Sequence, residues 1–158
     1  MLGPIYLHSD GSFDSYRSFF AHLQSKLDSV ELGGVEAGVT EMIVGSDEEK
    51  PLTKAIHRCF PESTVLLCCR HLEKNARRRL QDKVGAVLPV REKILQDLFG
   101  SDGLSNADDT HRFDKLACNI INNCETTVPD FTSYLTTKLI AALHAKVVNP
   151  RLQHGLCR

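Results

Sequence analysis

The stretch "MIVGSDEEKPLTKAIHRCFPESTVLLCCRHLEKNARRRL", residues 42–80, decides the fold that the sequence predicts. It contains or overlaps two short apolar runs, "VTEMIVGS" (39–46) and "TVLLC" (64–68). Such runs are typical of buried strands. Each run is followed by a segment of helical periodicity, and the second helix is expected from about residue 69 to residue 84. Strand, helix, strand and helix in this order predict parallel strands in an α/β layer.

The helix behind the first of these strands has both a start signal and a stop signal. Ser46 and Glu49 form a capping-box pattern, Ser-x-x-Glu, so the helix is expected to begin close to Asp47. Pro61 ends it, because the residue before a proline is disfavoured in helical conformation. The apolar face of this helix comprises Leu52, Ala55, Ile56, Cys59 and Phe60.

Upstream of this stretch the same alternation continues. "PIYLH" (4–8) predicts a further strand, and residues 13–27 predict an amphipathic helix with Ser12 as its N-cap. Residues 4–82 therefore alternate three strands with three helices.

Downstream of Val84 the strand signals stop. Helical periodicity predicts helices over residues 90–100, about 110–125 and about 130–147. The predicted division of the chain is an α/β part, residues 1–84, and an all-helical insertion or appendage, residues 85–158.

Composition limits the classes of protein that the chain can belong to. Hydrophobic residues make up 42% of the 158 residues and charged residues 25%, as in soluble globular proteins. The net charge of −1 gives no overall attraction to nucleic acid or to a membrane surface, so any such attraction needs a local cluster of charge. No apolar run reaches the roughly 20 residues of a membrane helix, and no secretion signal is expected. Six cysteines without a Cys-x-x-Cys pair are then expected to be reduced thiols inside a cell.

Asp47 is the first candidate for chemistry. It follows a buried strand directly, and in open α/β sheets sites lie outside the carboxyl ends of the strands. A carboxylate there is placed to bind Mg²⁺, which prefers hard oxygen ligands. The alternative is structural, because an aspartate in a first helical turn also complements the helix dipole.

Cys68 and His71 form a second candidate, a Cys-x-x-His pair at the next junction of strand and helix. Two ligands do not complete a structural zinc site, which takes four. A Cys/His nucleophile would need His71 beside a thiolate, and no orienting acid is evident in the sequence. A buried cysteine and a hydrogen-bonded histidine at the start of a helix are the structural alternative.

The helix after this pair is unusually basic. A stripe of its cations could neutralise several phosphates and bind nucleic acid independently of sequence, whereas a solvated basic face is the alternative. The cations proposed for such binding are Arg70, Lys74, Arg77, Arg78 and Lys83, and Arg79 lies among them.

The remaining polar residues give no site. The other histidines, His8, His22, His57, His111, His144 and His154, lack metal-ligand spacing, so structural or neutral roles are expected for them. Residues 99–109 lack the ordered oxygen ligands and the closing glutamate of a calcium loop, and a solvated turn is expected there.

Residues 42–80 resemble the centre of the Mutator-like element (MULE) transposase domain. That family has an apolar strand ending in Asp, a helix with Leu and Ala, Phe-Pro, a second apolar strand, Cys-x-x-His, and a helix with Asn. The matching residues here are Asp47, Leu52, Ala55, Phe60 and Pro61, Cys68, His71 and Asn75. The resemblance covers residues 1–84 well, and the helical remainder is more loosely similar to an insertion known in the family.

The resemblance implies a fold similar to ribonuclease H and a metal-dependent DNA transposase. Such transposases cut and join DNA with an Asp-Asp-Glu triad that holds two divalent ions, Mg²⁺ or Mn²⁺. It implies that Asp47 is the second acid of the triad and a metal ligand, and that Cys68 and His71 have an architectural role. DNA, a transposase complex or a homo-oligomer would be the partners, and the nucleus the location.

The other two acids of the triad have no clear match. Asp10 follows what resembles the third strand of the fold, two strands after the first acid, so it is expected to be a loop or helix-entry residue. The first acid is expected upstream of Met1, and the third, a glutamate, after the helical insertion; Glu125 lies inside it. These 158 residues are therefore expected to be a partial copy of a transposase core and catalytically incomplete. The alternatives are a non-catalytic module that binds nucleic acid or protein, and a small Cys/His enzyme.

Overall fold

The computed structural model describes residues 10–28, 42–47 and 49–155 of the chain. It divides into two compact units, residues 1–65 and residues 66–158. The predicted division between residues 84 and 85 differs from this one and lies inside the second unit. Most of the described residues are helical, and one small parallel sheet of two strands accompanies them.

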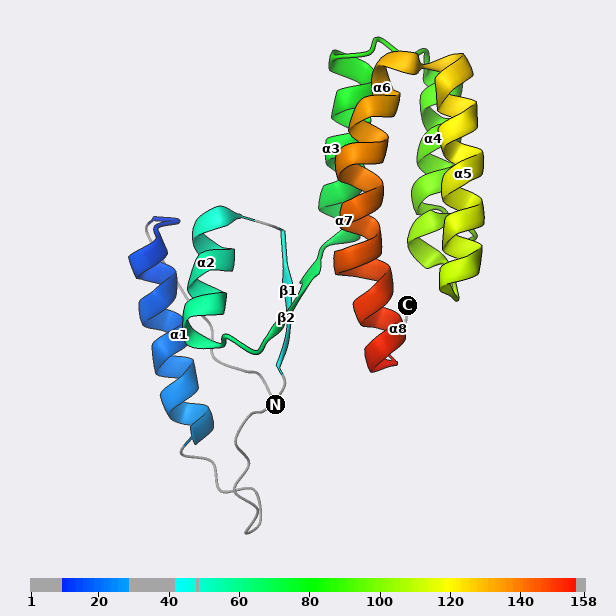
Figure 1. The fold of residues 1–158 in the computed structure, drawn as a ribbon. Helices are drawn as coiled ribbons and strands as arrows, with labels where there is room; N and C mark the ends of the chain where they lie inside the picture. The colour runs from blue at the N-terminus through cyan, green and yellow to red at the C-terminus, as the bar shows by residue number, and fades with distance from the viewer. Residues whose placement is uncertain (1–9, 29–41, 48, 156–158) are drawn as a thin grey trace. The chain divides into compact units, whose positions relative to one another are not determined.

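The first unit is built on two helices that pack along each other, α1 (Phe13–Asp28) and α2 (Lys50–Cys59) (Figure 1). Their contact is aromatic: the ring centroids of Phe20 and Phe60 lie 6.2 Å apart in an edge-to-face arrangement. The buried side chains of this unit are Tyr16, Phe20, Ala55, Ile56, Cys59 and Phe60. Of these, Ala55, Ile56, Cys59 and Phe60 are positions that helical periodicity placed on the apolar face of the helix before Pro61.

The two helices begin in different ways. Ser12 caps α1 as expected, because its hydroxyl accepts a hydrogen bond from the N–H of Ser15 at 3.2 Å. The capping box expected for α2 is wrong: this helix begins at Lys50, and Glu49 is its N-cap without a capping side-chain bond. Pro51 explains the shift, since a proline fits the first turn, where its missing N–H is not needed.

The sheet consists of β1 (Ile43–Ser46) and β2 (Thr64–Leu67), which pair in parallel. These are the second and third strands that the sequence predicts. Residues 39–41 of the predicted strand over 39–46 lie outside the described residues. The first predicted strand, residues 4–8, lies outside the described residues. At the level of described residues the chain is thus α/β with an excess of helix.

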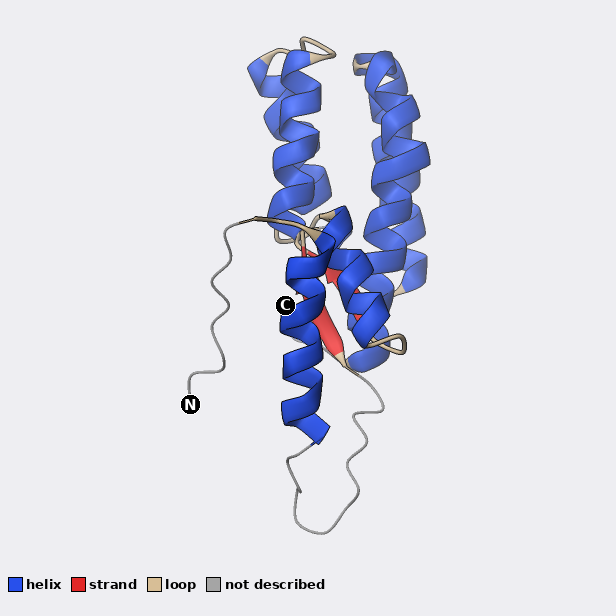
Figure 2. Cartoon of the chain, turned by 90° about the vertical axis from the view of Figure 1, so that its left-hand side faces the viewer, coloured by secondary structure: helices blue, strands red, loops and turns tan. Residues whose placement is uncertain are grey.

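The second unit is an antiparallel arrangement of four helical rods (Figures 1 and 2). The first three are α3 (Cys69–Asp82), α4 (Leu88–Phe99) and α5 (Thr110–Thr127), with the 3₁₀ turn η1 (Leu104–Asn106) between α4 and α5. The fourth rod joins α6 (Pro129–Tyr134), the π-helical η2 (Leu135–Ile140), α7 (Ala141–Leu143), the π-helical η3 (His144–Val148) and α8 (Asn149–His154). The three helices predicted after Val84 are confirmed.

The core of the second unit explains why the unit begins before α3. The apolar line of α3, Leu72, Ala76 and Leu80, is buried in the same cluster as the side chains of α4, α5 and the fourth rod. Phe113 and Phe131 are enclosed there, at 2% and 0% exposure. A helix buries its apolar face where a large apolar surface is available, and for α3 that surface is the helical bundle.

The turn between α4 and α5 is fixed by polar contacts. The Asp109 carboxylate caps α5 by accepting a hydrogen bond from the N–H of Arg112 at 2.7 Å. Arg151, from α8, donates to the carbonyl oxygens of Ser105, at 2.8 Å, and of Ala107. These two carbonyls belong to buried residues, so the arginine satisfies acceptors that water reaches poorly.

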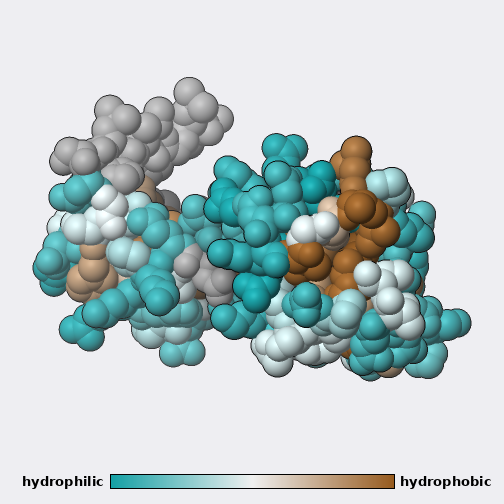
Figure 3. Space-filling view, turned by 90° about the horizontal axis from the view of Figure 1, so that it is seen from above, coloured by the Kyte–Doolittle hydropathy of each residue, from teal (hydrophilic) through white to brown (hydrophobic). Residues whose placement is uncertain are grey.

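The connection between α3 and α4 exposes apolar side chains. Val87 and Leu88 are 65% and 58% exposed, and Figure 3 shows an apolar patch on the second unit in the view from above. In the part of the chain that the structure describes, no helix is long and apolar enough to span a membrane.

Candidate functional site

Cys68 lies at the point where β2 ends and α3 begins. It is the N-cap residue of α3, and its carbonyl oxygen accepts the backbone N–H groups of His71 and Leu72, at 3.0 and 3.2 Å. The pKa of the Cys68 thiol is lowered, first by the backbone N–H of His71 and then by hydrogen bonding to the His71 side chain. The side chain is partly exposed. The Cys-x-x-His spacing therefore brings the two side chains together, as a Cys/His pair requires.

The neighbouring Cys69 has the opposite environment. It packs against the core of the second unit, and burial raises the pKa of its thiol. The two adjacent thiols thus differ in the direction of their pKa shifts because one faces backbone donors and the other apolar side chains. Within the described residues no group of three His, Cys, Asp or Glu side chains could hold a metal ion.

Asp47 follows β1 and is exposed. Its carboxylate accepts a hydrogen bond from the N–H of Glu49 at 3.3 Å, so it lies in the turn before α2 and not in the first turn of that helix. The carboxylate of Glu49 is itself engaged, because it accepts the hydroxyl of Tyr16 at 2.9 Å. The described residues around Asp47 do not fit a two-metal cluster, which needs several carboxylates at one place.

The cations of α3 differ in whether they already have an acidic partner. Arg77 forms ion pairs with Glu92 of α4 and with Glu73, the latter at 3.1 Å, and both raise the pKa of its guanidinium. This differs from the expectation that Arg77 shares an open stripe with Arg78. These ion pairs link α3 to α4, and because two carboxylates offset its positive charge, Arg77 attracts a phosphate less than an unpaired arginine does.

Three other cations of α3 have no acidic partner among the described residues. Arg70, Lys74 and Arg78 are spaced by four residues and exposed. Because the core line of Leu72, Ala76 and Leu80 is offset from them by two residues, about 200° around the helix, they face away from the core. We name Arg70, Lys74 and Arg78 the α3 stripe.

Two further cations of this segment lie outside the α3 stripe. The guanidinium of Arg79 stacks over the ring of Tyr134, 4.6 Å from its centroid. Lys83 is the C-cap residue of α3 and does not continue the four-residue spacing, although its side chain is exposed. Of the five cations proposed from the sequence, three therefore share one open face.

Sequence reasoning missed a polar pocket between α4 and α5, lined among others by Lys93, Asp97, Asn119 and Asn123. The signal was present, because each of these two pairs has a spacing of four residues. It was not distinctive, since polar residues flank the apolar line of most surface helices.

Comparison of the chain with protein-family models, with curated proteins and with solved structures gave no match.

Proposed function

We propose that this chain is a transposase-derived module that binds nucleic acid through the α3 stripe. The observation that carries the proposal is the open face of Arg70, Lys74 and Arg78, three exposed cations without an acidic partner in the described part of the chain. The derivation from a transposase rests on the match of residues 42–80 to the MULE pattern. On that basis the sheet and its helices represent part of a ribonuclease H-like core, and the nucleus and a transposase complex or homo-oligomer are the expected setting.

The geometry of the α3 stripe suits a phosphate backbone. Residues spaced by four lie about 6 Å apart along a helix, so the stripe extends over about 12 Å. One DNA strand carries a phosphate every ~3.4 Å along the axis, so a surface of this length can reach about three phosphates. Contacts of this kind provide affinity without reading the base sequence.

The salt dependence of DNA binding tests the proposal. We expect the chain to bind a fluorescent DNA duplex, with log K falling against log [salt] between about 50 and 200 mM. In the variant Arg70→Gln/Lys74→Gln/Arg78→Gln the slope should become shallower by about 2.7, or 0.9 for each of three lost phosphate contacts. Fluorescence anisotropy measures both slopes, and glutamine keeps the helix propensity of the exposed positions.

Adjacent arginines supply a matched control. Arg78→Gln removes one charge from the α3 stripe, and Arg77→Gln removes one charge from the ion pairs with Glu73 and Glu92. We expect the first to change the slope by about 0.9 and the second to leave it nearly unchanged. Equal effects of the two substitutions, or no binding at low salt, would refute the α3 stripe as the interface.

The ancestral activity of the family, metal-dependent DNA strand cleavage and transfer, is tested separately. Only Asp47 matches the family's acidic triad in these residues, and we expect no plasmid nicking with Mg²⁺ or Mn²⁺. Nicking by the wild-type chain that Asp47→Ala abolishes would show that the chain is a catalyst and that other residues complete its metal site.

A further inference from the structure

The open face of α3 is wider than the α3 stripe. Successive residues of a helix are turned by about 100°, and two contacts mark the borders of this face. At one border Arg77 pairs with Glu92 of α4, and at the other Arg79 stacks on the ring of Tyr134. The two borders are about 200° apart around the helix, and the α3 stripe occupies only about 80° of this sector.

Three exposed polar side chains beside the α3 stripe are unsuited to contact a base. The imidazole of His71 is hydrogen-bonded to the thiol of Cys68. The side-chain oxygen of Gln81 already accepts a hydrogen bond from Arg91 of α4 at 3.3 Å. Asp82 is the last residue of α3 and its carboxylate repels phosphates, so contacts with nucleic acid are expected in the earlier turns of the helix.

Asn75 is the polar side chain of this face that remains available. It is exposed in the middle of α3, about 100° around the helix from Lys74, and its carboxamide makes no hydrogen bond to the described residues. A carboxamide presents an acceptor oxygen and N–H donors side by side. The major-groove edge of adenine presents the complementary pair, the N6 amino group as donor and N7 as acceptor.

The α3 stripe determines where Asn75 lies on a duplex. In the proposed function the stripe follows the phosphates of one strand, so a side chain turned by about 100° from it faces the groove beside that strand. The major groove of B-form DNA, about 12 Å wide, admits a helix, whereas the minor groove, about 6 Å wide, is too narrow. The major groove of A-form RNA is also too narrow for side chains to read. The face therefore fits the major groove of duplex DNA.

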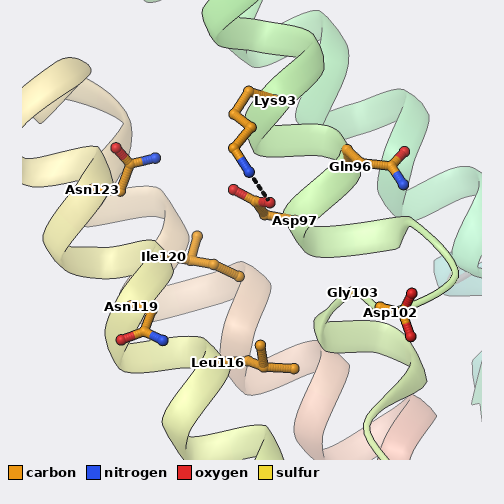
Figure 4. Close-up of a pocket in the computed structure, with 9 residues that line it drawn as sticks. All are labelled: Lys93, Gln96, Asp97, Asp102, Gly103, Leu116, Asn119, Ile120 and Asn123. Atoms are coloured by element: carbon orange, nitrogen blue, oxygen red, sulfur yellow. Dashed lines mark hydrogen bonds and ion pairs between the residues drawn. The ribbon is translucent and has the colours of Figure 1, made fainter.

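The pocket between α4 and α5 does not offer a second surface for DNA. The ammonium of Lys93, which lines it, is bonded to the carboxylate of Asp97 at 2.8 Å (Figure 4). Asp102 adds another carboxylate to the lining. The pocket therefore has no net positive charge that would attract a phosphate.

From this geometry we infer that Asn75 reads an adenine in the major groove of duplex DNA. Its side-chain oxygen accepts the N6 amino group, and its N–H donates to N7. The inference rests on the proposed function and adds a sequence preference, which phosphate contacts alone do not provide.

Selection from a library of DNA duplexes with a randomised centre tests the inference on the full chain. We expect the wild-type chain to enrich duplexes with adenine at one position, and replacement of that base pair to weaken binding about fivefold to a hundredfold, as for one bidentate base contact. Asn75→Ala should lose this preference and keep the salt slope of the wild-type chain, because no phosphate contact is removed. Asn122→Ala is the matched control, since Asn122 is an exposed asparagine of α5 and its loss should change neither property.

An altered base tests the contact itself. In 7-deazaadenine a C–H group replaces N7, so the acceptor for the N–H of Asn75 is absent. Placed at the selected position, it should weaken binding of the wild-type chain and leave binding of Asn75→Ala unchanged. A residue that only stabilised α3 would not produce this difference.

Salt-dependent binding without a base preference would refute the inference and leave the proposed function intact. The same holds for a preference that Asn75→Ala retains, or for 7-deazaadenine weakening both proteins equally. Equally tight binding of an RNA duplex would exclude insertion into the major groove. Absence of DNA binding at low salt would instead refute the proposed function itself, so the two failures are distinguishable.

Discussion

The cores of the two units differ in how completely they enclose their aromatic side chains. In the first unit Tyr16, Phe20 and Phe60 each retain 8% exposure in a core that, among the described residues, is formed by α1, α2 and side chains of the small sheet such as Val44 and Val65. In the second unit Phe113 and Phe131 retain 2% and 0%, because four rods surround them. Enclosure from several sides removes more apolar surface per residue, so the second unit should contribute most of the stability.

The largest expected effect comes from a matched pair of aromatic truncations. Phe131→Ala should destabilise the second unit by about 3–5 kcal/mol, because the neighbours of a fully enclosed ring relax only partly into the cavity. Phe20→Ala should cost less, since its site opens to solvent and can collapse. Amide hydrogen exchange in α5 and in α1 measures the two losses separately.

The comparison of the two cores would fail if Phe20→Ala cost as much as Phe131→Ala. Lys138→Ala is the control for the fourth rod, because Lys138 is exposed in η2 and its loss should leave exchange in α5 unchanged.

Single polar contacts test the difference between the two units on a smaller energy scale, beginning with Arg151 in the second unit. Arg151→Ala should destabilise this unit by about 1–3 kcal/mol, because the carbonyls of the buried residues Ser105 and Ala107 lose their donor. Arg151→Lys keeps the charge, but one ammonium does not reproduce the planar set of N–H donors of a guanidinium. Lysine should therefore recover only part of the lost stability. Urea denaturation followed by circular dichroism measures both; full recovery by lysine would mean that charge alone matters.

The corresponding polar contact in the first unit, between Tyr16 and Glu49, should contribute less to stability. Tyr16→Phe removes the hydroxyl that donates to Glu49 at 2.9 Å and keeps the ring in the core, so we expect a loss of about 1 kcal/mol. Glu49→Gln is the complementary variant, because its amide oxygen can still accept the hydroxyl. Hydrogen exchange in α2 should therefore increase more in Tyr16→Phe than in Glu49→Gln, and the reverse order would contradict the role of this bond.

The elements that were predictable from the sequence are those with strong local signals. The helices over residues 13–27, 69–84, 90–100, 110–125 and 130–147 follow from apolar periodicity, and Pro61 and Ser12 mark boundaries that the structure confirms. The start of α2 was not predictable from Ser46 and Glu49 alone, because Pro51 competes for the same turn. Local patterns fail where two of them specify different boundaries.

The tertiary contacts of each helix were the other feature that the sequence alone could not predict. The pattern of α3 predicts an apolar line but not which core it joins, and the structure places Leu72, Ala76 and Leu80 with the helical half. Likewise charge counting does not separate Arg77 from Arg78, because Glu92, which pairs with Arg77, is 15 residues away in the chain. The Cys68–His71 contact, by contrast, depends only on a three-residue spacing at a helix start, and the sequence was sufficient to suggest it.

Cys68 allows the smallest and most local test, at the point where the second unit begins. Its folded pKa lies below the ordinary value of a cysteine thiol, whereas burial and Asp97 raise the pKa of Cys124, in the core, to about 11. At neutral pH Cys68 should therefore be alkylated by iodoacetamide faster than Cys124, because the thiolate is the reacting form. Mass spectrometry of the labelled peptides gives both rates.

The substitution His71→Ala tests the cause of this shift. It removes the imidazole but keeps the backbone N–H that contributes most, so the pH at which Cys68 becomes reactive should move upward only in part. Because the folded pKa of Cys68 is below its unfolded value, the thiolate stabilises the fold at high pH, and this contribution is lost as the pH falls through the folded pKa. An unchanged pH profile of Cys68 reactivity in His71→Ala would mean that the backbone at the start of α3 alone lowers the pKa of the thiol. The imidazole of His71 would then have no effect on Cys68.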